Sequence, residues 1–112
     1  MKRRSPLLIA GVPELMILCL LAEREMYGYE LARSIRVLSH DALSLGEGVL
    51  YPALHSLEQR KLLRSRRARA LGRMRIYYAL APAGRTRLEI LTSDWRRISA
   101  SLEMILGRPD HV

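Results

Sequence analysis

Residues 60–80 read RKLLRSRRARALGRMRIYYAL, and their pattern decides the fold. In the second half of this stretch, apolar side chains stand at every second position, at Met74, Ile76, Tyr78 and Leu80. This two-residue repeat of β-forming side chains predicts a half-buried strand. Residues 62–68 provide a partner strand, and residues 70–73, which include Gly72, provide a turn between the two. The stretch therefore predicts a β-hairpin.

The predicted hairpin is strongly basic. Residues 60–75 include eight Arg and Lys side chains and no acidic one, within a chain of 112 residues whose formal net charge is +8. Such a charge favours a polyanionic partner, and arginines on a hairpin can contact phosphates and reach into a minor groove. The alternative is a solvated loop whose charge only aids solubility. We expect DNA contacts from Arg66, Arg67, Arg69, Arg73 and Arg75.

Three helices are predicted before the hairpin. Pro13 suits a first helical turn, so the apolar run at residues 15–22 indicates a buried helix that follows a basic arm at residues 1–12. An amphipathic helix comes next, with its apolar stripe at Leu31, Ala32, Ile35 and Leu38. The third helix begins near Gly48 or Val49, or it bends at Pro52.

Three helices followed by a basic hairpin is the order of a winged helix-turn-helix, in which the third helix lies in the major groove and the hairpin follows the backbone. The predicted fold class is therefore mainly α (α+β), with residues 13–81 as a DNA-binding domain that carries a β-hairpin wing. On this geometry Tyr51 and His55 face DNA with groups that can bond phosphates or base edges. Alternatively, Tyr51 covers the rim of the core and His55 is an ordinary surface histidine.

A long helix is predicted from Pro82 to Leu106, with Gly107 and Pro109 ending it. Apolar residues recur three and four positions apart and form one seam, made of Leu88, Leu91, Trp95, Ile98, Leu102 and Ile105. A single helix cannot bury such a seam alone. We therefore expect residues 82–107 to join two copies in a homodimer, with residues 108–112 as a tail.

The sequence offers little for an enzyme or a membrane protein. His40, His55 and His111 show no metal-ligand spacing with Cys19, and no nucleophile or phosphate-binding motif occurs, so we expect no catalysis, no cofactor and no metal. The apolar run at residues 15–22 is shorter than the roughly 20 residues that cross a bilayer, so no membrane partner is expected. Cys19 is the only cysteine, which predicts a reduced, cytoplasmic setting, and its position inside the apolar run predicts a buried thiol.

Two other binding functions are considered. RNA recognition favours aromatic side chains on one exposed sheet face, whereas Tyr77 and Tyr78 are neighbours on one strand and point to opposite faces. The remaining alternative is a non-catalytic protein–protein interaction module with a basic electrostatic patch. This module would be monomeric in isolation, whereas a DNA-binding regulator would stay dimeric on dilution.

Three motifs resemble those of the PadR-like transcriptional regulators: MYGYELA at residues 26–32, GVLYPALHSLE at residues 48–58 and YYALAPAGR at residues 77–85. The resemblance implies a winged helix domain, a dimer formed through the C-terminal helix, and repression of genes for detoxification, efflux or stress response. Ala81 departs from the family pattern, because a threonine, a better helix cap, is more common before the proline.

The single C-terminal helix resembles the short branch of that family, in which the dimer interface can enclose a cavity for flat, apolar effectors. Trp95 lies near the middle of the predicted seam. Two interpretations of Trp95 stay open. It packs the dimer core, or it stacks with its symmetry mate on a planar aromatic or apolar effector.

Overall fold

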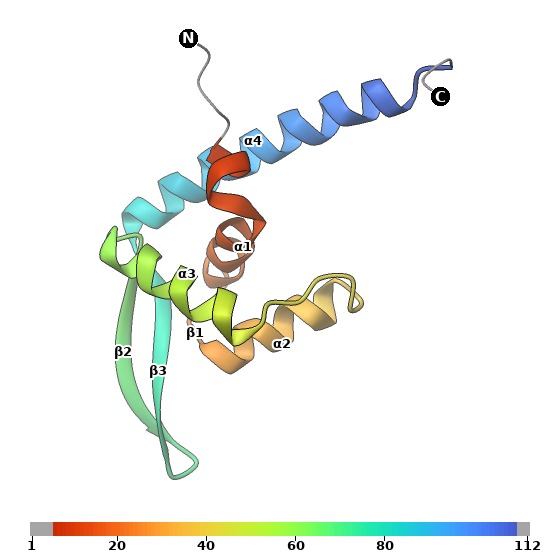
Figure 1. Cartoon of the computed structure of the whole chain (residues 1–112). Helices are drawn as coiled ribbons and strands as arrows, with labels where there is room; N and C mark the ends of the chain where they lie inside the picture. The colour runs from red at the N-terminus through yellow and green to blue at the C-terminus, as the bar shows by residue number, and fades with distance from the viewer. Residues whose placement is uncertain (1–5, 110–112) are drawn as a thin grey trace.

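Three helices, a β-hairpin and a long C-terminal helix follow one another, and this order confirms the predicted fold class. The structure is a computed structural model that describes residues 6–109. Its elements are α1 (Pro6–Leu21), β1 (Met26–Tyr27), α2 (Gly28–Leu38), α3 (Glu47–Gln59), β2 (Leu63–Ala70), β3 (Arg73–Leu80) and α4 (Pro82–Leu106). Most of the predicted tail, including His111, lies outside the described residues. Figure 1 shows the hairpin projecting from one side of the helices and α4 extending past the other.

α1 begins earlier than the sequence predicts. Helical backbone starts at Pro6 and is kinked at Gly11, whose φ of 84° is accessible to glycine at little cost. Pro13 follows in the first turn after the kink, where its missing N–H leaves no bond unmade. The predicted arm at residues 1–12 is therefore too long, and residues 1–5 lie outside the described part of the chain. None of the described helices is long and apolar enough to cross a bilayer.

The core lies where α1 meets the other helices and the base of the sheet. Its buried side chains are Ile17, Leu18, Leu20, Leu21, Met26, Leu31, Ile35, Leu50, Leu54, Leu57, Leu63, Tyr78 and Leu91. The amphipathic pattern of α2 is confirmed at Leu31 and Ile35, but Leu38 is 67 % exposed. Leu38 is the last residue of α2, and the chain leaves helical geometry just after it, where His40 and Asp41 have positive φ and the Asp41 N–H donates to the Arg36 carbonyl oxygen.

α3 starts at Glu47, one or two residues before the predicted start at Gly48 or Val49. The backbone N–H groups of Val49 and Leu50 both donate to the Gly46 carbonyl oxygen, which fixes the first turn. The helix continues through Pro52 to Gln59. Because Pro52 has no N–H, it cannot donate the usual helical hydrogen bond to the carbonyl oxygen of Gly48, four residues earlier.

The hairpin is a long antiparallel pair joined by a two-residue turn. β2 and β3 pair from Leu63 with Leu80 out to Ala70 with Arg73. The turn residues Leu71 and Gly72 both have positive φ, 52° and 77°. Positive φ at both central residues defines a type I′ turn, whose twist matches that of the flanking strands. The predicted hairpin is thus confirmed.

A two-residue strand that the sequence analysis missed completes the sheet. β1 pairs with β3, with Met26 opposite Tyr78 and Tyr27 opposite Tyr77, so the strand order is β1-β3-β2. This pairing covers only the base of the hairpin, and within residues 6–109 the outer residues of β3 have no strand partner on that side. The outer part of the wing therefore extends beyond β1 as a two-stranded hairpin, as Figure 1 shows.

α4 spans Pro82–Leu106 as predicted, but its first half belongs to the core of its own chain. Leu91 is 0 % exposed, and Leu88 packs against the same core. The assignment of Leu91 to an intermolecular seam is therefore wrong, because its side chain is used completely within one chain. Trp95, Leu102 and Ile105 lie farther along the helix and are exposed.

Candidate nucleic-acid interface

The outer face of α3 carries the two residues that the sequence analysis assigns to DNA contact. Leu50, Leu54 and Leu57 anchor the inner face in the core, so Tyr51 and His55, four residues apart, lie on the outside. Side chains with this spacing occupy one side of a helix. α3 therefore presents a phenol and an imidazole together.

Tyr51 also packs on the start of α2. A Cβ atom added at Gly28 would lie 2.5 Å from the Tyr51 hydroxyl oxygen, so the ring is held close against the Gly28 backbone. The side chain nevertheless keeps 38 % of its surface exposed. Both interpretations of Tyr51 thus describe part of its position, and its contact with DNA remains a prediction.

A groove of about 730 Å³ separates α3 from the hairpin. It is lined by Tyr51, His55, residues 27–29, Arg73–Ile76 and Tyr78. The structure therefore brings four of the seven predicted DNA-binding residues, Tyr51, His55, Arg73 and Arg75, to one concave surface. Burial raises the pKa of Tyr78 at the inner edge of this groove, and Glu58 and Tyr51 add to the rise.

Arg66 and Arg75 brace the wing against the body. The Arg66 guanidinium forms an ion pair with Glu25 and lies 5.0 Å from the centre of the Tyr77 ring. The hydrogen bonds from Arg66 hold the pKa of Glu25 below its ordinary value. The Arg75 guanidinium lies 4.3 Å from the centre of the Tyr27 ring, and Tyr27 in turn meets Tyr77 edge to face. Through these contacts, the two arginines connect the hairpin to Glu25 and Tyr27, the residues on either side of Met26.

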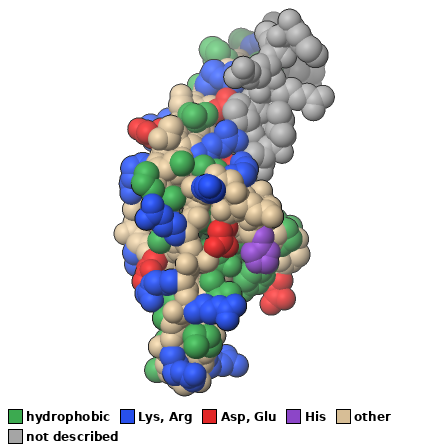
Figure 2. Space-filling model, turned by 90° about the vertical axis from the view of Figure 1, so that its left-hand side faces the viewer, with side chains coloured by type: hydrophobic (Ala, Val, Ile, Leu, Met, Phe, Trp, Pro, Cys, Tyr) green, Lys and Arg blue, Asp and Glu red, His purple; other side chains and the backbone are tan. Residues whose placement is uncertain are grey.

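The other wing arginines have no such intramolecular partners. Among the described residues, the side chains of Arg64, Arg67, Arg69 and Arg73 form neither an ion pair nor a hydrogen bond. Strand alternation and register place Arg67 and Arg69 on the same face of the hairpin as Tyr78, the face turned to the body of the protein. Figure 2 shows Lys and Arg side chains following the hairpin to its end, with hydrophobic side chains between them.

The comparisons with known proteins agree with this geometry. The sequence profile of the transcriptional regulator PadR-like family matches residues 17–90, which include α2, α3 and the whole hairpin. The chain belongs to the PadR-like family. In this PadR-like regulator, α1, α2, α3 and the hairpin form the winged helix.

Solved and curated relatives support this assignment. Over 90 residues, the chain is 36 % identical to the transcriptional regulator Rv3488 of Mycobacterium tuberculosis, covering 80 % of this chain and 78 % of the relative. A PadR family transcription regulator from Clostridium difficile R20291 is 32 % identical, with a TM-score of 0.76 and 87 % and 100 % of the two chains covered. A transcriptional regulator from Clostridium thermocellum is 26 % identical, with a TM-score of 0.79 and coverage of 91 % and 97 %.

A second, apolar groove of about 460 Å³ lies between α1, the end of α2 and α4 of this PadR-like chain. Trp95, which is 44 % exposed, lines it together with Cys19, Leu38 and Leu43. Cys19 is exposed, so the expectation of a buried thiol is wrong. The apolar run of α1 led to that expectation, but one side of the helix borders this open groove.

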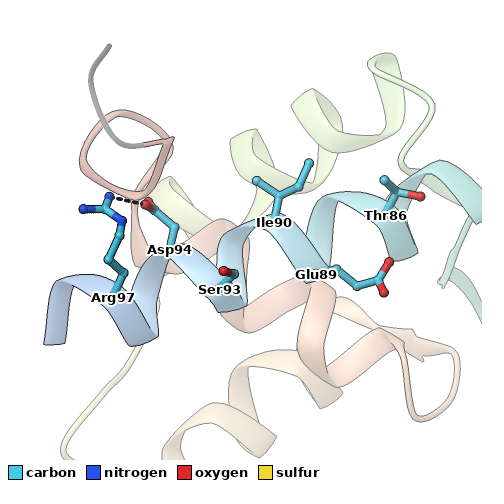
Figure 3. A pocket seen from close by; sticks show the side chains of 6 residues that line it. All are labelled: Thr86, Glu89, Ile90, Ser93, Asp94 and Arg97. Atoms are coloured by element: carbon cyan, nitrogen blue, oxygen red, sulfur yellow. Dashed lines mark hydrogen bonds and ion pairs between the residues drawn. The ribbon is translucent and has the colours of Figure 1, made fainter. Parts of the chain in front are cut away.

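The opposite side of α4 is polar. Thr86, Glu89, Ile90, Ser93, Asp94 and Arg97 line a shallow hollow of about 470 Å³, drawn in Figure 3. Asp94 is nearly buried, and its Oδ1 accepts a hydrogen bond of 2.6 Å from Arg97 Nη2. The apolar surface that remains for a partner is therefore on the side of Trp95.

A buried carboxylate connects the DNA-binding domain to α4. Glu14 has a side chain that is 7 % exposed, and its Oε2 lies 3.0 Å from Arg60 Nη2, at the end of α3. Its Oε1 lies 3.2 Å from Arg87 Nε in α4. Glu14 thus links α1, the end of α3 and α4, a connection between distant residues that no local sequence pattern announces.

Proposed function

We propose that this PadR-like regulator is a homodimeric repressor whose α3 helices enter adjacent major grooves while the wings hold the flanking backbone. The observation that carries the proposal is the groove between α3 and the wing, where Tyr51 and His55 face arginines that have no acidic partner. Arg67, Arg69 and Arg73 would supply most of the phosphate attraction. Arg75 would act chiefly by keeping the wing in place, because its guanidinium lies on Tyr27.

The homodimer is supported by apolar surface that one chain leaves exposed. Trp95, Leu102 and Ile105 lie along one stripe of α4, and about half of each side chain is exposed. Ile98, on the same stripe, is half-buried. A partner helix would cover this surface, and two-fold symmetry would place the two α3 helices about 34 Å apart, one turn of DNA.

The proposal also includes control of DNA binding by a small effector. The apolar groove beside Trp95 offers an indole face and aliphatic walls to a planar aromatic ligand. A ligand bound there would contact both α1 and α4, so it could change the angle between the two DNA-binding heads. Repression would be relieved if the ligand binds more tightly to an arrangement that no longer fits one operator.

The test is binding to the DNA upstream of the protein's own coding region, measured by fluorescence anisotropy at two salt concentrations against a scrambled duplex. We expect tight, salt-dependent and selective binding by the dimer. Equal and weak binding to both duplexes would favour the interaction module instead. Titration with planar aromatic compounds, read by Trp95 fluorescence, tests the effector. If the protein binds its operator but its Trp95 fluorescence does not change with any of these compounds, the effector proposal is wrong.

Matched variants test whether the wing arginines contact the DNA phosphates. Arg67→Ala combined with Arg69→Ala should reduce the steepness of the salt dependence by about 1.8, because each lost phosphate contact removes about 0.9 from the slope. Arg85→Ala, an exposed arginine at the start of α4, is the control and should leave the slope unchanged. An unchanged slope in the double variant would contradict the wing assignment.

A further inference from the structure

The residue at the very tip of the wing is a leucine in an unfavourable position. Leu71 is 91 % exposed, more than any other large hydrophobic side chain among the described residues. Its φ of 52° lies in the left-handed region, where a bulky residue is costly and where type I′ turns prefer Asn, Asp or Gly. The tip therefore combines exposed apolar surface with backbone strain, and no residue in the described part of the chain covers the leucine.

The surroundings of Leu71 favour one kind of partner. Arg69 and Arg73 flank it in the two strands, and neither makes an ion pair or hydrogen bond through its side chain with any described residue. The paired strands are eight residues each, about 25 Å long, and β1 braces them only at Tyr77 and Tyr78. Figure 1 shows the tip far from the helices. A projecting turn with one apolar side chain between two arginines therefore fits a polyanion whose surface has a narrow groove.

We propose that Leu71 is an apolar wedge that enters the minor groove beside the α3 contact and partly unstacks one base step there. Arg69 and Arg73 would bind the phosphates on the two sides of the groove. This inference rests on the proposed DNA binding and adds a contact that reads the deformability of the DNA instead of its base edges. Burial between sugars and bases would give the leucine the apolar environment that water does not.

A membrane surface is the other polyanion to which a basic hairpin with an apolar tip could bind. One leucine inserts too little apolar surface to hold a protein on a bilayer, since stable anchoring needs a larger apolar area or a lipid chain. The chain also belongs to a family of transcriptional regulators. DNA is therefore the partner that the observations favour, and vesicle binding is an outcome that the test can reveal.

The test compares Leu71→Asn with Leu71→Met in the full-length protein. Asparagine adopts positive φ readily and keeps the charge, so the turn should persist, and thermal denaturation checks that the midpoint does not fall. We expect Leu71→Asn to bind a selected operator duplex about tenfold more weakly with an unchanged salt slope, because an apolar contact is lost and no phosphate contact is. Leu71→Met should stay within about twofold of the wild type, since methionine is also an effective wedge.

Unstacking is measured directly with 2-aminopurine placed at successive positions of the same duplex. Wild-type protein should raise the fluorescence at one step at the edge of the site, and Leu71→Asn should not. Equal affinity and equal fluorescence for the two proteins would overturn the wedge and leave DNA binding intact. If the wild type selects no duplex from a random pool, the proposed function fails and the wedge with it. Leucine-dependent binding to phosphatidylglycerol vesicles, without this DNA effect, would also overturn the wedge.

Discussion

At the scale of single residues, two glycines differ in whether the surrounding structure leaves room for a side chain. A Cβ atom at Gly84, in the first turn of α4, would lie 2.2 Å from the Leu62 carbonyl oxygen and 2.7 Å from Leu80 Cδ1. The same Leu62 oxygen accepts the hydrogen bond from the Ala81 N–H that joins the hairpin to α4. The absence of a side chain at Gly84 therefore sets how closely α4 approaches the hairpin.

We predict that Gly84→Ala lowers the free energy of unfolding by about 2 kcal/mol or more, because the backbone at Leu62 must move. Gly48→Ala is the matched control. A Cβ atom there meets nothing within 4 Å, and alanine favours helix, so the change should be neutral or stabilise by about 0.5–1 kcal/mol. Chemical denaturation measures both variants. Equal stability of the two would contradict the packing argument.

At the scale of elements, the wing depends on a brace that local patterns do not reveal. Alternation in residues 74–80 and the basic run before them predicted the hairpin and its turn, because both signals are local. β1 is only two residues long and has no periodicity to detect. The ion pair between Arg66 and Glu25 joins residues 41 positions apart, so it appears only in three dimensions. The sequence therefore predicted five wing arginines as equivalent, whereas in the structure Arg66 and Arg75 contact Glu25 and Tyr27 of the same chain.

Glu25→Gln tests this brace through its pH dependence. The ion pair holds the pKa of Glu25 below its ordinary value of 4.5, so its contribution to stability is present above that value and is lost as the pH falls through the lowered pKa of the folded state. Wild-type protein should therefore have a higher melting temperature than Glu25→Gln at pH 7, and the difference should shrink as the pH falls below 4.5. A difference that does not change with pH would show that the pair does not act through its charge.

At the scale of the whole molecule, one helix has two functions along its length. The seam predicted from three- and four-residue spacing is continuous in the sequence, but the fold divides it. The half of α4 around Leu88 and Leu91 completes the core of its own chain, and the half around Leu102 and Ile105 stays exposed. Periodicity shows which residues share a face and cannot show which neighbour covers them. The division arises because α1 packs against the first half of α4, a contact between elements far apart in the sequence.

We predict that a charge on the exposed half of α4 disrupts the dimer. Leu102→Asp would place a charge in the proposed interface between two copies, where it could not be solvated, and the change should shift the dimer to monomer at micromolar concentration. Ser93→Asp is the control, because Ser93 lies in the polar hollow on the other side of the helix and is exposed. Sedimentation equilibrium measures the shift, and both variants should keep the far-ultraviolet circular dichroism of the wild type.

DNA binding by the same variant distinguishes loss of the dimer from damage to the winged helix of one chain. A duplex with two half-sites holds both α3 helices only if the chains are joined, so Leu102→Asp should bind it far more weakly than wild type. Binding to a single half-site should change little, because α3 and the wing belong to one chain. If Leu102→Asp remains a dimer and binds the full site normally, the partner surface lies elsewhere on the molecule, and Trp95 then has no symmetry mate to meet.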